Sequence, residues 1–317
     1  MTQLPDPSAP FRFGSRGSPL ALAQAHETRT RLMAAFDLPE AAFEIQVIKT
    51  TGDDRTLLAA DRPLKEIGNK GLFTKEIEEA MLRGDIDIAV HSSKDLPTVQ
   101  PDGLIVDCFL PREDVRDAFI SLTGATLSTL KEGSVVGTSS LRRRAQLLNR
   151  RPDLKIIEFR GNVQTRLAKL EEGVADGTFL AMAGLNRLGM GDVGAKAIET
   201  DEMLPAVAQG AIGIERRISD DRAAEMLAAL HDKPTGQRLA AERAFLATLE
   251  GSCETPIAAL ATLSDGRVTL QGEVLRTDGS KCIAGSRNGF AHEGDEIGRA
   301  LAEALLSEAG NGFFDWR

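Results

Sequence analysis

The stretch DIDIAVHSSKDLPT, residues 85–98, carries the strongest structural signal in this 317-residue chain. Ile86, Ile88 and Val90 alternate with other residues, a pattern typical of a short β-strand. The second half is polar and ends at Pro97, so the polar side chains follow the carboxyl end of the strand. Ligands bind at that edge in open α/β sheets. The stretch therefore predicts either a functional loop or a solvated turn in which Ser and Asp only shape the backbone.

Composition places the chain among ordinary globular proteins. Its length allows two or three domains, and 42% hydrophobic residues can fill their cores. The first residues have neither a basic start nor an apolar run, and no segment approaches the roughly 20 apolar residues of a membrane span. We expect a cytoplasmic protein that does not bind membranes. The three cysteines and four histidines lack metal-ligand spacing, so we expect no disulfide framework and no metal site.

Charge is distributed unevenly along the chain. The net charge is −9, yet residues 142–166 hold eight cations and two acids, which gives +6 there and leaves −15 elsewhere. A basic island in an acidic protein suits a compact anionic ligand, because the surrounding field would oppose an extended polyanion. Aromatic residues are only 4% of the chain. We therefore expect no nucleic-acid partner.

The first hundred residues predict a sheet with helices between its strands. We expect strands at 11–15, 42–51 and 103–110, and helices at 20–36 and 74–83. Ser18 suits the N-cap of the first helix and Pro19 its first turn. A helix that starts directly after a strand offers an anion site, to which Arg16 adds a full charge. Residues 52–70 lack periodicity and predict a long loop, of a length often found in lids.

A second unit, in which predicted strands are again followed by possible helix starts, comes after a crossing segment at residues 111–117. We expect its strands at 134–137, 155–159 and 179–184. Each predicted strand ends in Ser, Thr or Arg residues where a helix could start. Such residues are common as helix caps, which is the simpler interpretation. Their coincidence with the basic island favours anion binding instead.

The last part of the chain has a different character. Residues 204–215 are apolar and rich in Gly, as a strand that passes back between two domains would be. A helix at 237–249, strands at 268–274 and 281–286, and a helix at 293–309 predict a small α+β domain. The turn EGSCETP, residues 250–256, exposes the thiol of Cys253 after a helix that Gly251 could end in a left-handed conformation. A buried, inert cysteine is the alternative.

Seven ordered motifs resemble one known family. They are RGSPLAL (16–22), KGLF (70–73), HSSKD (91–95), VGTSSLRR (136–143), RGNV (160–163), AQG (208–210) and GSCETPI (251–257). Together they are similar to the porphobilinogen deaminase, or hydroxymethylbilane synthase, family over about residues 11–309. The resemblance departs from the family pattern at the cysteine turn, where Ser252, Glu254 and Thr255 stand in place of the common Gly, Gln and Val. Glu66 stands where some relatives carry a lysine.

The resemblance implies a fold. It is an α/β fold in which two periplasmic-binding-protein-like α/β domains face a cleft, with a C-terminal α+β domain. Domain 1 would comprise residues 1–110 and 205–228, domain 2 residues 111–204, and domain 3 residues 229–317. A monomer is expected.

The resemblance also implies a reaction. Four porphobilinogen molecules would be condensed head to tail, each losing ammonia, to give hydroxymethylbilane for porphyrin and heme biosynthesis. A dipyrromethane cofactor, attached through a thioether to Cys253, would prime the chain. The main alternative is a cytoplasmic small-anion-binding or sensor module with the same two-domain cleft, which would not explain the exposed thiol.

Motif matching assigns roles to individual residues. Asp95 would be the catalytic carboxylate, which stabilises the positive charge that appears during reaction. The cofactor would be bound by Ser92, Lys94, Asp95, Thr138, Ser140, Arg142 and Arg143. The substrate would be bound by Arg16, Ser18, Lys70, Phe73, Arg160, Arg166, Arg187 and Gln209. Each pyrrole carries an acetate and a propionate, and guanidinium groups pair with carboxylates better than ammonium groups do.

Overall fold

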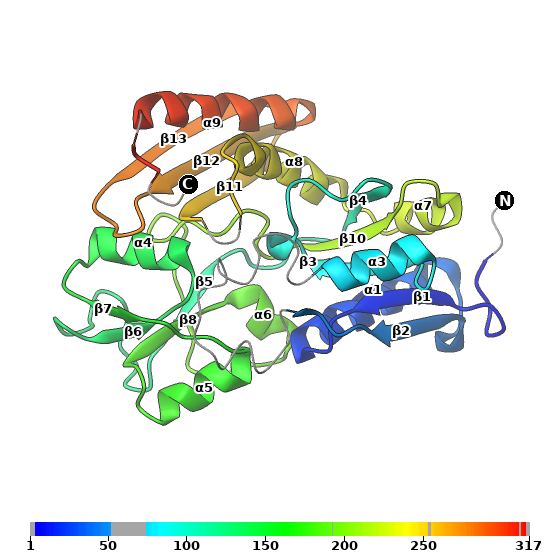
Figure 1. Cartoon of the computed structure of the whole chain (residues 1–317), viewed down its shortest axis with the longest axis horizontal. Coiled ribbons are helices and arrows are strands. Elements are labelled where there is room, and N and C mark those ends of the chain that lie inside the picture. Colours follow the sequence, from blue (N-terminus) through cyan, green and yellow to red (C-terminus); the bar gives the residue numbers. More distant parts are fainter. Residues whose placement is uncertain (1–3, 52–73, 192, 253–254, 311, 315–317) are drawn as a thin grey trace. The chain divides into compact units, whose positions relative to one another are not determined.

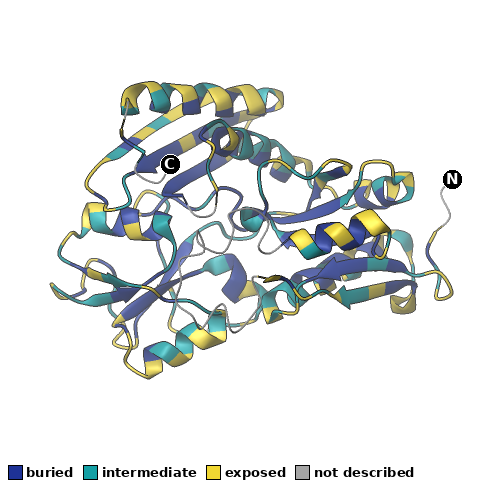
Figure 2. Ribbon diagram, in the orientation of Figure 1, coloured by how far each residue is buried: buried dark blue, intermediate teal, exposed yellow. Residues whose placement is uncertain are grey.

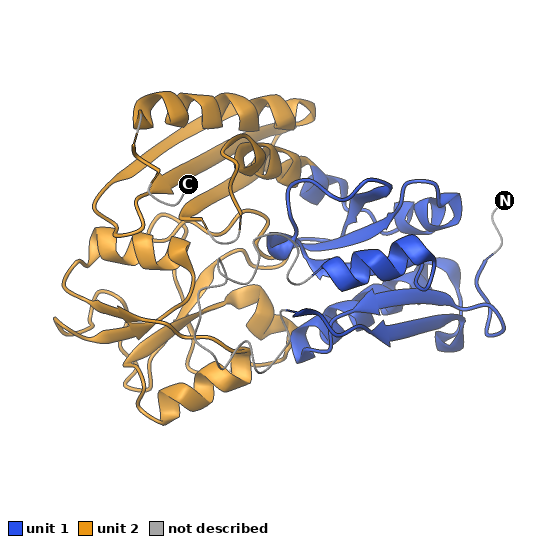
Figure 3. Cartoon of the chain, in the orientation of Figure 1, with its two compact units in different colours: residues 1–112, 211–236 blue, residues 113–210, 237–317 orange. Residues whose placement is uncertain are grey.

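The computed structural model describes residues 4–51, 74–191, 193–252, 255–310 and 312–314. The predicted loop at 52–70, with Glu66, and the predicted site residues Lys70, Phe73 and Cys253 lie outside these residues. The chain divides into two compact units, Met1–Arg112 with Ala211–Gly236, and Glu113–Gly210 with Gln237–Arg317 (Figure 3). The three-domain boundaries given above stay a prediction.

The first unit is built on a five-stranded sheet. Its elements are β1 (Phe11–Ser15), α1 (Pro19–Phe36), η1 (Glu40–Ala42), β2 (Phe43–Val47), α3 (Lys75–Arg83), β3 (Ile88–Ser92), η4 (Ser93–Asp95), β4 (Leu104–Phe109), β10 (Ile212–Arg217) and α7 (Asp221–Ala228). The strand order is β2-β1-β3-β10-β4. Strand β1 is parallel to β2 and β3, whereas β10 runs antiparallel to both of its neighbours, β3 and β4.

The core of this unit is aromatic at its centre. Phe11, Phe13 and Phe43 are buried, and Phe13 packs edge to face against each of the other two rings. Figure 2 shows the buried strands and the exposed outer face of α3. The predicted helix cap is confirmed, because Ser18 Oγ accepts a hydrogen bond of 3.3 Å from Ala21 N and Pro19 opens α1.

The second unit contains a sheet with the same pattern. Its elements are β5 (Asp117–Ile120), β6 (Val135–Gly137), α4 (Leu141–Arg150), β7 (Lys155–Ile157), α5 (Val163–Glu171), β8 (Gly177–Ala181), α6 (Met182–Arg187) and β9 (Lys196–Ala197). The order is β7-β6-β8-β5-β9, with β6 parallel to β7 and β8 and β5 antiparallel to β8. In both sheets, the fourth strand in the order is antiparallel to the third.

The C-terminal part of the second unit is an antiparallel α+β structure. Its elements are α8 (Lys233–Thr248), β11 (Ile257–Ser264), β12 (Arg267–Leu275), β13 (Cys282–Phe290), η5 (Ala291–Glu293) and α9 (Gly294–Ala309). Helix α9 packs on β12 and β13 (Figure 1). The predicted combination of two α/β parts and a C-terminal α+β part is therefore confirmed.

Three expectations about elements were wrong. The predicted strand at 179–184 is β8 and ends at Ala181, where α6 begins. Residues 204–211 form no strand, and β10 starts only at Ile212. The C-terminal sheet has a third strand, β11, which the sequence pattern did not reveal.

No helix in the described ranges has the length and apolar character needed to cross a bilayer.

Candidate functional site

The loop after β3 is held in place from two sides. Ser93 N donates a hydrogen bond of 3.0 Å to Ala211 O, just before β10. Gln24 Nε2, on α1, donates a hydrogen bond of 2.9 Å to Ser92 Oγ. Within the described ranges the half-buried carboxylate of Asp95 has neither a hydrogen bond nor an ion pair. The strand end therefore presents an unpaired carboxylate on a fixed backbone.

A buried group of titratable side chains lies behind this loop. His91 Nε2 lies 3.1 Å from Glu215 Oε2, and both side chains are buried. Glu78, on α3, is also buried, and burial raises the pKa of its carboxyl group. The sequence analysis missed Gln24 and Glu215. Their polar side chains within apolar runs were the available signal.

Two other predicted residues lie at the same edge of this sheet. Strands β1 and β3 are adjacent and parallel, so their carboxyl ends meet there. Arg16 and Ser18 follow β1, and Lys94 and Asp95 follow β3. The topology thus brings both motifs of the first unit together.

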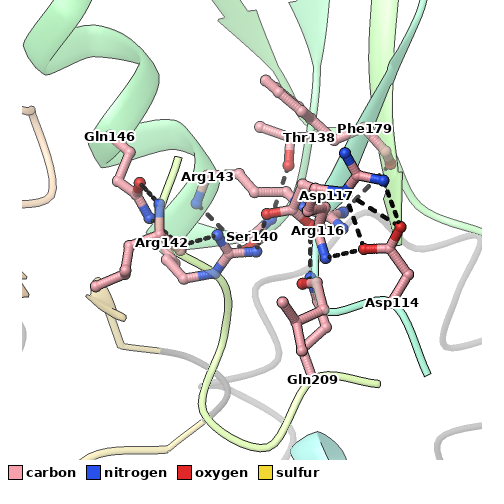
Figure 4. A network of polar contacts seen from close by, with 12 residues as sticks. Asp114, Arg116, Asp117, Thr138, Ser140, Arg142, Arg143, Gln146, Phe179 and Gln209 are labelled. Atoms are coloured by element: carbon pink, nitrogen blue, oxygen red, sulfur yellow. Dashed lines mark hydrogen bonds and ion pairs between the residues drawn. The ribbon is translucent and has the colours of Figure 1, made fainter. Parts of the chain in front are cut away.

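In the second unit, the two arginines that begin α4 are buried against one carboxylate (Figure 4). Arg142 Nη2 lies 2.7 Å from Asp117 Oδ2, and Arg143 Nη2 lies 2.7 Å from Asp117 Oδ1. The exposed fractions of the three side chains are 4%, 7% and 0% in the order Arg142, Arg143, Asp117. Asp117 was not predicted from the sequence, because residues 111–117 have the pattern of a crossing segment only.

The backbone positions both guanidinium groups further. Arg142 Nη1 donates to Leu204 O at 2.8 Å, and Arg143 Nη1 donates to Phe179 O at 3.2 Å. The start of α4 is organised by the predicted caps, because Ser140 Oγ accepts from Arg143 N at 3.4 Å and Thr138 Oγ1 accepts from Ser140 N at 3.2 Å. Thr138 and Ser140 therefore act at least as structural caps here.

Arg166 completes what we call the arginine cluster, Arg142, Arg143 and Arg166. Its Nε donates to Gly161 O at 3.0 Å and its Nη1 donates to Phe179 O at 3.4 Å, the carbonyl that Arg143 also uses. Burial, and next the charge of Arg143, lower the pKa of Arg166 to about 10. No carboxylate of the described residues pairs with Arg166. The formal charges of these three guanidinium groups and the carboxylate of Asp117 sum to +2; the buried carboxyl group of Glu273, whose pKa is raised by burial, also acts on Arg142.

The remaining predicted residues of this unit lie in two places. Gln209 Nε2 donates to Asp117 Oδ1 at 3.1 Å and to Val115 O at 2.8 Å, so it joins the arginine cluster through Asp117. Arg187 Nη2 donates to Gly210 O at 3.1 Å, next to Gln209 in the chain. Arg160 Nε instead lies 3.6 Å from Glu158 Oε2. Within the described ranges, no hydrogen bond or ion pair joins Arg160 to the arginine cluster.

The described residues on either side of Cys253 are held by hydrogen bonds and close packing. Thr255 Oγ1 accepts a hydrogen bond of 3.0 Å from Ser252 N and donates one of 2.7 Å to Ser252 O. A Cβ at Gly251 would lie 2.5 Å from Leu246 Cδ1, so a larger residue would require the Leu246 side chain to shift. The left-handed residue is Glu250, with φ of 53°, and not Gly251 as expected.

The thiols of the two described cysteines are harder to ionise than a free thiol. Cys108 is buried, as predicted, and burial raises the pKa of its thiol to about 12. Cys282 lies in β13, and burial together with the charge of Glu273 raises the pKa of its thiol to about 12. No group of three or more metal-ligating side chains occurs in the described part of the chain.

Comparisons of the sequence point to one family. Residues 11–225 match the family described as "Porphobilinogen deaminase, dipyromethane cofactor binding domain", and residues 237–307 match "Porphobilinogen deaminase, C-terminal domain". The porphobilinogen deaminase of Paracoccus denitrificans is 65% identical, with 100% of each chain covered. The chloroplastic porphobilinogen deaminase of Pisum sativum is 54% identical, with 97% of this chain and 84% of the relative covered.

Solved structures align with the chain only loosely. A putative periplasmic sulfonate-binding protein from Methylobacillus flagellatus gives a TM-score of 0.38 at 16% identity, covering 71% of this chain and 66% of its own. A ligand-binding component of an ABC-type import system from Staphylococcus aureus gives 0.40 at 12% identity, covering 73% and 74%.

Proposed function

Because the chain belongs to the porphobilinogen deaminase family, we propose that it is a transferase, hydroxymethylbilane synthase, which joins four porphobilinogen molecules head to tail with release of ammonia. The product, hydroxymethylbilane, feeds porphyrin and heme biosynthesis. One observation carries this proposal: the relative at 65% identity covers the whole chain. A small-anion-binding module, the alternative considered from the sequence, is not favoured by this full-length match.

The charge of the arginine cluster supports a substrate that carries carboxylates. Its net charge of +2 comes from buried guanidinium groups, which bind carboxylates through two parallel hydrogen bonds. Each porphobilinogen unit brings two carboxylates, so this donor set fits the growing chain. We assign substrate binding to the predicted set of Arg16, Ser18, Lys70, Phe73, Arg160, Arg166, Arg187 and Gln209.

A dipyrromethane cofactor fits the same donor set. We propose that it is attached to Cys253 through a thioether and that its carboxylates are bound by Ser92, Lys94, Thr138, Ser140, Arg142 and Arg143. When bound, the cofactor supplies the pyrrole carbon to which the first substrate unit is joined. The high thiol pKa of Cys108 and Cys282 makes both poor nucleophiles, which supports attachment at Cys253.

The carboxylate of Asp95 is suited to stabilise the positive charge that develops during the reaction. Loss of ammonia from porphobilinogen leaves a cationic electrophile, and the attacking pyrrole ring is cationic until it loses a proton. A half-buried carboxylate with no partner in the described ranges can stabilise both cations and accept that proton. Gln24 and Ala211 hold the loop, so the carboxylate needs little reorganisation during the reaction.

The remaining assignments are part of the same proposal. We place the enzyme in the cytoplasm as a monomer without nucleic-acid or membrane partners. We divide it into domain 1 (residues 1–110 and 205–228), domain 2 (111–204) and domain 3 (229–317).

The catalytic proposal is tested by Asp95→Asn in the purified enzyme. We expect normal folding, substrate binding within about threefold of wild type, and a fall in kcat of about a hundredfold or more, the usual contribution of a positioned acid or base. Asp85→Asn is the matched control, because Asp85 pairs with Arg83 in an exposed turn at the other end of the same strand. Near-normal turnover of Asp95→Asn would remove Asp95 from the mechanism.

The cofactor proposal is tested by intact-mass measurement of the same preparations. Wild-type protein is expected to carry an adduct of about two pyrrole units that Cys253→Ser lacks, whereas Cys108→Ser keeps it. An adduct that persists in Cys253→Ser would place the attachment elsewhere. Wild-type protein without any adduct would count against the proposal that this chain is hydroxymethylbilane synthase.

A further inference from the structure

Asp117 reaches the arginine cluster because of the sheet topology. Strand β5 is antiparallel to β8, and its first residue, Asp117, lies opposite Ala181, the last residue of β8. Strands β6 and β8 are parallel, so their carboxyl ends lie at the edge where β5 begins. Helix α4 starts from that edge with Arg142 and Arg143. An antiparallel strand thus adds a carboxylate to an edge otherwise lined with cations.

The contacts of Asp117 are those of a counter-ion. Oδ1 accepts from Arg143 Nε at 3.1 Å, from Arg143 Nη2 at 2.7 Å and from Gln209 Nε2 at 3.1 Å. Oδ2 lies 2.7 Å from Arg142 Nη2. Asp117 is completely buried, and a buried carboxylate is stable only when paired and hydrogen-bonded. Asp117 and the two arginines therefore hold one another in place.

The counter-ion also determines how much negative charge the cluster can still accept. Burial lowers the pKa of Arg142, and the charge of Asp117 opposes this effect. Arg166 has no such partner among the described side chains and shares the Phe179 carbonyl with Arg143. Without Asp117, the guanidinium groups of Arg142 and Arg143 would lose the carboxylate that lies between them, and the repulsion among the three arginines would rise.

We propose that Asp117 is a positioning residue, the fixed counter-ion of Arg142 and Arg143, and that it limits the arginine cluster to two ligand carboxylates. That these carboxylates belong to pyrroles rests on the proposed function. The role of Asp117 as counter-ion does not rest on the proposed function. Neutralising Asp117 should leave a cluster with one more uncompensated positive charge, which binds anions more tightly but in a less defined geometry.

The experiment uses the purified full-length protein and succinate, a plain dicarboxylate, as the probe. Thermal unfolding is followed against succinate concentration at constant ionic strength, which is maintained with sodium chloride. Asp117→Asn is expected to unfold at a lower temperature without succinate and to bind succinate about tenfold more tightly, as one pKa unit of charge interaction would give. Its kcat for porphobilinogen should fall while succinate binding improves. A merely structural role predicts the same loss of stability at every succinate concentration, and that result would overturn the proposal.

Matched variants separate charge from location. Asp114→Asn is the control, because Asp114 lies three residues earlier and pairs with Arg116 near the surface, so its succinate affinity should match wild type. Arg166→Gln removes one cation of the cluster and should weaken succinate binding. Equal succinate affinities in Asp114→Asn and Asp117→Asn would contradict the counter-ion role.

A second variant covers the case in which Asp117→Asn does not fold. Combining it with Arg142→Met removes one positive and one negative buried charge together, and folding should be restored. Failure of the double variant to fold would contradict the counter-ion role. Failure of the proposed function is distinguishable, since wild-type protein would then lack deaminase activity while the succinate comparison still decides the role of Asp117.

Discussion

Glu78 is a buried carboxyl group of the first unit whose pKa differs between the folded and the unfolded chain. Burial raises the pKa of its carboxyl group, the neighbouring Thr74 side chain lowers it, and the charge of Glu215 raises it again. The net direction is upward, so the folded protein binds a proton at Glu78 more tightly than the unfolded chain does.

This upward shift predicts a pH-dependent stability. Because the folded pKa exceeds the unfolded one, the stabilising effect is complete below the unfolded pKa and is lost as pH rises through the folded pKa. From about pH 4.5 to about pH 8, wild type should therefore lose more free energy of unfolding than Glu78→Gln does. Urea unfolding at both ends of this range measures the difference. Glu79→Gln changes an exposed neighbour and should lose as much free energy of unfolding as wild type. The same loss in all three proteins would show that Glu78 is not the source of the pH dependence.

Single residues could be predicted where local sequence explains them. Ser18 and Ser140 are caps because a strand, a hydroxyl and a helical pattern follow one another within a few positions. The partners of Asp117 and Glu215 were not predictable, because they lie 26 and 124 residues away in the chain. Only the pairing of β5 with β8, and of β10 with β3, brings these residues to their partners.

Among the connecting segments, Ser252 is held to Thr255 through the hydroxyl of Thr255. Thr255→Val keeps the shape of the side chain but removes both hydrogen bonds to Ser252, each worth about 1 kcal/mol. We expect the free energy of unfolding to fall by about 1–2 kcal/mol. We also expect hydrogen exchange in residues 250–252 to be faster, while Thr255→Ser exchanges as wild type. Unchanged exchange in the valine variant would show that the hydroxyl does not hold the turn.

Element type was easier to predict than element extent. The alternation of strands and helices in residues 11–110 correctly predicted a sheet with helices between its strands, and the resemblance to a family implied the α/β fold. The end of β8 was misplaced because an apolar run such as residues 179–184 has no periodicity that separates strand from helix. Strand β11 was missed because its sequence, IAALATLS, is rich in alanine, which does not favour strands.

At the scale of the whole molecule, the first unit is assembled from two separate stretches of chain. Strand β10 lies between β3 and β4 in the sheet, yet the 102 residues from 110 to 211 separate β4 from β10 in the sequence. In the second sheet β5 and β8 are separated by only the 56 residues from 121 to 176. Closing the longer loop costs more chain entropy.

Pairing in the second sheet should therefore form first when the chain refolds from denaturant. In pulse-labelling hydrogen exchange, amides of β5 and β8 are expected to gain protection before amides of β3 and β10. The amides of β12 and β13, which form a local hairpin, provide an early reference. Simultaneous protection of both sheets would show that loop length does not set the order.

The same interruption has a consequence for biosynthesis. A ribosome completes β3 and β4 about a hundred residues before it makes the strand that joins them, so both nascent strands emerge with unpaired edges. Such edges attract other strands, and this interval is when the growing polypeptide is most exposed to aggregation. Chaperone demand for this enzyme should accordingly peak before residue 217 leaves the exit tunnel, and decline once β10 is inserted.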